Sequence, residues 1–108
     1  MNEGHLIKND KLWEAVNALV YGEGDARSRV TVACLMLDKM NSKELPPDLQ
    51  RRIDIVKDEA GKKGALRSID GDVLRDRYTH TSKTRVNKTY AKLANEIYKI
   101  YCELNERT

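Results

Sequence analysis

The stretch VNKTYAKLANEIYKIYCELN, residues 86–105, decides the fold. Apolar side chains recur in it every three or four residues, which is the spacing of one face of an α-helix. They are Val86, Tyr90, Leu93, Ile97, Ile100 or Tyr101, and Leu104. Lys88, Lys92 and Lys99 fall on the opposite side, with Glu96 spaced to pair with a lysine. The pattern predicts a long C-terminal helix with one buried side, ending near residue 105.

Three further helices are predicted upstream. One spans residues 10–21, a second begins after Asp25 and ends near residue 40, and a third follows the tandem prolines 46 and 47 and ends at Gly61. Each segment repeats apolar residues at helical spacing. Proline is well tolerated in the first turn of a helix, where an N–H has no partner in any case.

The segment 61–81 is expected to be a loop-rich linker before the last helix. Leu66, Ile69, Val73 and Leu74 are spaced for a short amphipathic helix, but the Asp-Gly pair at 70 and 71 interrupts it. We therefore expect one or two helical turns and a mobile loop in residues 64–80. No strand pattern is identified. The hydroxyl residues 79, 81 and 82 offer N-caps for the final helix.

These elements predict an all-α protein, a small antiparallel bundle of four main helices with room for a fifth short one. Residues 1–108 are expected to form a single domain, because a chain of this length buries enough surface for one core. Short connections make consecutive helices antiparallel neighbours. Residues 1–8 are expected to be a flexible tail.

Several classes of chemistry have no support in the sequence. Cys34 and Cys102 stand alone in apolar runs, which argues against a disulfide framework or a cysteine metal site. His5 and His80 lack the spaced partners of a metal centre, and no glycine-rich phosphate loop or nucleophile motif occurs. We therefore predict no bound metal and no small-molecule cofactor. The first ten residues lack the apolar core of a signal peptide, and no apolar run reaches the length of a membrane span, so we expect a cytoplasmic protein without a membrane partner.

Basic residues are concentrated in the second half of the chain. Residues 1–60 hold 9 basic and 11 acidic residues, whereas residues 61–108 hold 11 basic and 6 acidic ones. The candidate phosphate contacts are Arg75, Arg77, Lys83, Arg85, Lys88 and Lys92. Cations gathered in this way can neutralise several phosphates of a nucleic acid. The ordinary alternative is that they are the solvated outer face of a helix.

Residues 75–80, RDRYTH, resemble the R-x4-6-H signature of HEPN ribonucleases, which are also small helical bundles. The resemblance implies that two protomers bring Arg75 and His80 together over an RNA phosphate. The guanidinium would hold the phosphate, and the imidazole would move a proton near neutral pH. This is one of two alternatives to a binding role without catalysis, the other being a nucleic-acid-binding module.

The last helix carries apolar residues on more than one side, and three tyrosines are among them. Tyr90, Tyr98 and Tyr101 are amphipathic side chains of a type enriched in protein interfaces. Our first prediction is therefore a small non-enzymatic interaction protein that works through protein contacts and self-associates as a homodimer. The alternative for these tyrosines is that they close the bundle against Trp13 and the second helix.

Overall fold

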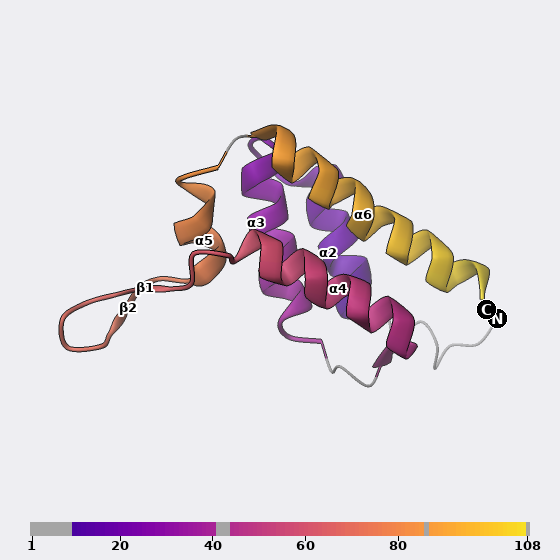
Figure 1. Cartoon of the computed structure of the whole chain (residues 1–108). Helices are drawn as coiled ribbons and strands as arrows, with labels where there is room; N and C mark the ends of the chain where they lie inside the picture. The colour runs from indigo at the N-terminus through magenta and orange to yellow at the C-terminus, as the bar shows by residue number, and fades with distance from the viewer. Residues whose placement is uncertain (1–9, 41–43, 86, 108) are drawn as a thin grey trace.

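Helices make up most of the chain in the computed structural model, which describes residues 10–40, 44–85 and 87–107 (Figure 1). In order, the elements are α2 (Asp10–Tyr21), α3 (Ala26–Leu37), α4 (Pro47–Ala60), β1 (Leu66–Arg67), β2 (Val73–Arg75), α5 (Arg77–Ser82) and α6 (Asn87–Glu106). The all-α prediction is supported, with a small two-stranded sheet added. The predicted tail 1–8 and the first stripe residue, Val86, lie outside the described residues.

The helix boundaries follow from local chemistry. Helix α3 begins after Asp25, as predicted, and the Asp25 carboxylate caps it by accepting a hydrogen bond from the Ser28 N–H at 3.2 Å. Helix α4 begins at Pro47 and ends as predicted before Gly61, whose N–H donates to the Lys57 carbonyl at 2.9 Å. Helix α3 ends earlier than predicted, because residues 38–40 form a turn.

The core lies between α3, α4 and α6, with α2 packed along α3 and α6. The side chains of Leu12, Val30, Leu49, Ile53, Ile97 and Ile100 are fully buried in it. On the surface between α4 and α6, Arg52 pairs with Glu96 at 2.7 Å and with Glu103. Within the described ranges, no helix is both long and apolar enough to cross a membrane.

The segment predicted to form helical turns is instead a β-hairpin that projects from the helical body (Figure 1). Strands β1 and β2 are antiparallel, and the Ser68 N–H donates to the Asp72 carbonyl at 2.8 Å. The turn closes with the Gly71 N–H donating to the Ser68 carbonyl at 3.0 Å, and Gly71 has a φ of 91°. Glycine adopts this left-handed conformation at little cost. The prediction that the chain contains no strand was therefore wrong.

Helix α5 joins the hairpin to the core. Its N-cap is Asp76, whose carboxylate accepts from the backbone N–H groups of Tyr78 and Thr79 at 3.0 and 2.9 Å. The residues predicted to cap α6 lie inside α5, so that prediction was wrong. Tyr78 is 1% exposed, and its hydroxyl donates to the Asp38 carboxylate at 2.7 Å. Burial, followed by the negative charge of Asp38, raises the pKa of Tyr78 above its ordinary value.

Candidate functional site

An aromatic pair lies exposed where α2 meets α6. The rings of Trp13 and Tyr101 stack with their centroids 6.3 Å apart and their planes at 26°. Trp13 keeps 47% of its surface exposed, and Tyr98, one turn before Tyr101, keeps 50%. Large aromatic side chains left half in water are the kind of residue that protein interfaces use.

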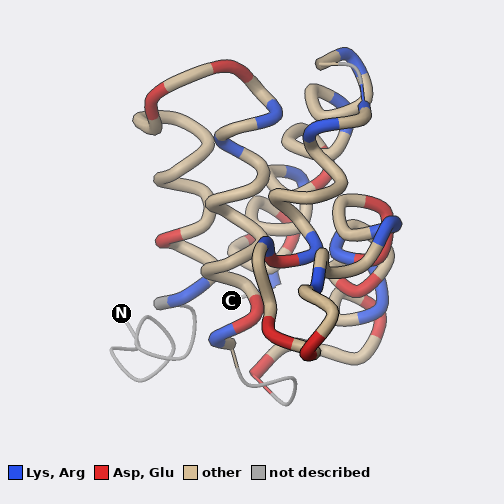
Figure 2. Tube along the Cα trace, turned by 90° about the vertical axis from the view of Figure 1, so that its left-hand side faces the viewer, with Lys and Arg blue, Asp and Glu red and all other residues tan. Residues whose placement is uncertain are grey.

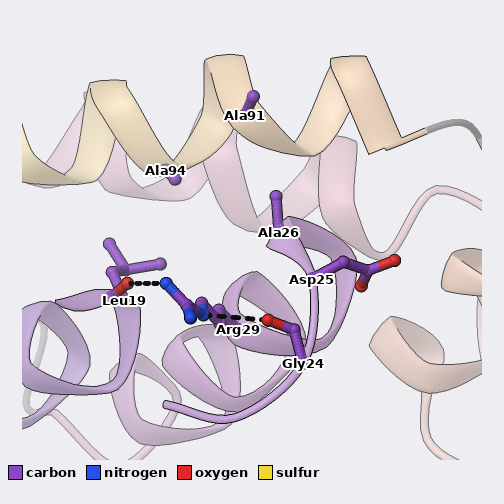
Figure 3. Close-up of a pocket in the computed structure, with 7 residues that line it drawn as sticks. All are labelled: Leu19, Gly24, Asp25, Ala26, Arg29, Ala91 and Ala94. Atoms are coloured by element: carbon purple, nitrogen blue, oxygen red, sulfur yellow. Dashed lines mark hydrogen bonds between the residues drawn. The ribbon is translucent and has the colours of Figure 1, made fainter. Parts of the chain in front are cut away.

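A small pocket continues this surface toward the turn between α2 and α3. It encloses about 440 Å³ and is lined by Leu19, Gly24, Asp25, Ala26, Arg29, Ala91 and Ala94. Figure 3 shows Ala91 and Ala94 on α6, across the pocket from the α2–α3 turn. Arg29 closes that turn, since its Nε donates to the Gly24 carbonyl at 3.1 Å and its Nη1 to the Leu19 carbonyl at 3.3 Å.

The alanines that line the pocket and the tyrosines of α6 lie on one stripe of that helix. Ala91, Ala94, Tyr98 and Tyr101 are spaced by three, four and three residues, which places them along one side of the helix. We call this stripe, together with Trp13 and Leu19, the α2/α6 surface. Its first half is lined by small side chains, and its second half carries large ones.

The three predicted interface tyrosines lie in different surroundings. Tyr98 and Tyr101 belong to the α2/α6 surface, whereas Tyr90 is 1% exposed and packs in the core. Its hydroxyl has no hydrogen-bond partner among the described residues, and burial raises its pKa. Because a buried ring offers no area to a partner, Tyr90 has to be withdrawn from the predicted interface.

The predicted catalytic residues lie on different elements. Arg75 is the last residue of β2 and is exposed, whereas His80 lies in α5 beyond the cap residue Asp76. The Nδ1 atom of His80 is 3.1 Å from the Gly64 carbonyl oxygen. The resemblance to HEPN ribonucleases implies that one surface presents both side chains. The contact of His80 with Gly64 does not bring the imidazole ring to Arg75.

The six predicted phosphate contacts fall into two groups. Arg77 approaches Asp38 at 3.6 Å and Asp58 at 3.8 Å, and Arg85 pairs with Glu59 at 3.3 Å. These two guanidinium groups hold α5 and the start of α6 to the rest of the protein. The remaining four are exposed and make no ion pair with any described residue: Arg75, Lys83, Lys88 and Lys92.

Sequence reasoning missed residues that the fold brings to the same place. The turn at 61–64 packs on α5, where the Lys63 N–H donates to the buried Thr81 hydroxyl at 3.0 Å. Lys62 and Lys63 are exposed in this turn. The GKKG sequence of the turn was the only signal available, since the contact joins residues 18 positions apart.

Comparison of the chain with protein-family models, with curated proteins and with solved structures finds no match. In the described part of the chain, no group of three or more His, Cys, Asp or Glu side chains is arranged to hold a metal ion.

Proposed function

We propose that this protein is a non-enzymatic interaction module that pairs with a second copy of itself through the α2/α6 surface. The observation that carries the proposal is the division of one stripe of α6 into a half with alanines beside a pocket and a half with the exposed Tyr98 and with Tyr101 stacked on Trp13. The proposal treats α2, α3, α4 and α6 as one four-helix bundle. It also places the protein in the cytoplasm, where its two free thiols would stay reduced.

A two-fold axis would make the α2/α6 surface complementary to itself. In a two-fold dimer the same patch of both copies takes part, so each contact occurs twice. If the two copies of α6 cross in opposite directions, Tyr98 of one copy faces the alanines of the other. Each copy then supplies one large side chain and one pocket of about 440 Å³ to receive it.

The surroundings of the aromatic side chains keep the cost of dimer formation low. Lys11 and Glu14, which flank Trp13 in the sequence, pair with each other at 3.1 Å, so each offsets the charge of the other. The stacking on Tyr101 already orients Trp13 in the monomer. A side chain held in place before binding loses less conformational entropy on association.

Sedimentation velocity over a range of concentrations tests the proposal. We expect the wild-type protein to form a dimer, and we expect Tyr98→Ala to raise its dissociation constant by about 30-fold, because a central aromatic residue contributes about 2 kcal/mol. Ala91→Arg should also give a monomer, since it places a charged side chain at an exposed position beside the pocket.

Ile55→Ala is the matched control. Ile55 lies on α4 with 60% of its surface exposed, away from the α2/α6 surface, and its truncation should leave the dimer intact. All variants should keep the wild-type urea midpoint. A wild-type monomer at every concentration would contradict the proposal, as would equal weakening by the Tyr98 and Ile55 variants.

A further inference from the structure

The charge of this protein is strongly divided along the chain and in space. Residues 61–92 hold nine basic and three acidic residues, whereas the rest of the chain holds 11 basic and 14 acidic ones. Figure 2 looks onto the end of the molecule from which the hairpin projects, with Lys and Arg gathered around the hairpin base and beyond α5. A concentration of one sign of charge at one end attracts a partner of the opposite sign.

The structure separates the cations that hold the fold together from those that remain free. Arg77 and Arg85 pair with carboxylates of α4 and of the turn after α3, and Arg85 Nη1 also donates to the Glu59 carbonyl at 2.9 Å. Five of the exposed cations that make no ion pair with any described residue lie around α5 or in the first turn of α6. These are Lys62, Lys63, Arg75, Lys83 and Lys88, which we call the basic end.

The basic end is assembled around α5 from three segments. Lys62 and Lys63 come from the turn that binds Thr81, and His80 contacts the Gly64 carbonyl in the same turn. Arg75 directly precedes the N-cap of α5, and Lys83 is its C-cap residue. Four of the five cations therefore flank a helix of only six residues, and Lys88 lies in the first turn of α6.

The charges at the basic end suit a polymer with repeated anionic groups better than a single small anion. The hollow beside Lys83 encloses about 390 Å³, but the Asp25 carboxylate lines it together with Arg27, Ser28 and Ser82. A carboxylate in the hollow repels a single bound anion. Cations spread over a surface can instead each meet a different phosphate of one chain.

The aromatic residues of the segment favour a duplex over a single strand. Proteins that bind single strands stack bases on exposed rings. The aromatic residues of 61–92 are Tyr78 and Tyr90, and each is 1% exposed. They cannot serve as stacking platforms, whereas contact with the phosphates of a duplex needs no exposed ring.

We propose that the basic end binds the phosphate backbone of duplex nucleic acid without reading its sequence. The hairpin tip limits the area of contact, because Asp70 and Asp72 place negative charge there (Figure 2). The duplex therefore lies against α5 and the hairpin base. This inference concerns a surface separate from the α2/α6 surface and does not depend on self-association.

Fluorescence polarisation with a labelled duplex of about 20 base pairs tests the inference, at salt between about 50 and 200 mM. Five phosphate contacts predict a slope of log affinity against log salt of about −4.5. The double variant Lys62→Glu/Lys63→Glu should weaken binding at least tenfold and reduce the slope by about 2. The matching single strand should bind more weakly than the duplex.

The control is Arg51→Glu/Lys99→Glu, which makes the same change in net charge at exposed positions on α4 and α6 outside the basic end. It should weaken binding much less than the Lys62 and Lys63 variant, and both should keep the wild-type urea midpoint. Equal weakening by the two double variants would overturn the inference, as would the absence of salt-dependent binding. Tighter binding of the single strand would overturn the choice of a duplex. The monomeric Tyr98→Ala variant should bind the duplex with the wild-type affinity per chain.

Discussion

Asp38 is predicted to be a surface carboxylate on which the attachment of α5 depends. Its Oδ1 accepts from the Tyr78 hydroxyl at 2.7 Å and pairs with the Lys57 ammonium at 2.9 Å. Arg77 donates to the Tyr78 hydroxyl oxygen, also at 2.7 Å. The Asp38→Ala substitution removes the acceptor of a buried O–H group and one partner of an ion pair.

The expected cost follows from the burial of each partner. A buried hydroxyl left without an acceptor costs about 1–3 kcal/mol. The Lys57 side chain is 18% exposed and Asp38 is 38% exposed, so solvent screens their ion pair, whose loss costs about 0.5 kcal/mol. We expect Asp38→Ala to lower the free energy of unfolding by about 2 kcal/mol in total.

Urea unfolding of the wild type and four variants measures this effect. Tyr78→Phe alone should cost about 1 kcal/mol, and the Asp38→Ala/Tyr78→Phe double variant should cost less than the sum of the two, because the second change removes the stranded hydroxyl. Glu23→Ala, at an exposed position in the α2–α3 turn, is the control and should change stability by less than about 0.5 kcal/mol. An Asp38→Ala variant as stable as this control would refute the reasoning, and so would strict additivity in the cycle.

Three further predictions concern the thiols, one surface ion pair and the hairpin turn. Burial, followed by the charge of Asp38, raises the pKa of Cys34 to about 12, and the side chain of Cys34 is 0% exposed. A thiol reagent at mildly alkaline pH should therefore label Cys102 alone until denaturant exposes both thiols. The hydrogen bonds from Arg107, at 3.0 and 2.6 Å, hold the pKa of Asp48 at about 2, and NMR titration of Arg107→Ala should return that pKa to near its ordinary value of 3.8. Because this pKa is depressed in the folded state, the stabilisation from the pair is present above about pH 4 and is lost as the pH falls toward 2; an unchanged pKa in the variant would contradict the assignment. Gly71→Ala should destabilise the hairpin by about 1 kcal/mol, because Gly71 has a positive φ, and should speed amide exchange in β1 and β2 without affecting the helices.

The helices could be predicted because their signals are local. The apolar stripe of α6, the tandem prolines at the start of α4 and Gly61 after its end each act within a few residues of the element they define. The hairpin was missed because its strands are two and three residues long, too short to show alternation. The Asp-Gly pair at its turn was a usable signal, since glycine after a short polar residue is typical of hairpin loops.

The candidate surfaces could be predicted only in part. Tyr98 and Tyr101 were identified from their positions on the last helix, but the pairing of Tyr101 with Trp13 joins the two ends of the chain. Which cations are free depends on contacts such as Arg85 with Glu59, which are far apart in sequence. A sequence shows how many charges a segment carries, whereas only the fold shows which of them are already paired.

The emission of Trp13 over a dilution series is the most direct test of self-association through the α2/α6 surface. Trp13 is the single tryptophan of the protein and lies half-exposed on that surface. If two copies pair there, emission should be blue-shifted at millimolar concentration and should move to the red on dilution to nanomolar, as water reaches the indole ring. An emission maximum that stays constant over the whole series would contradict the account.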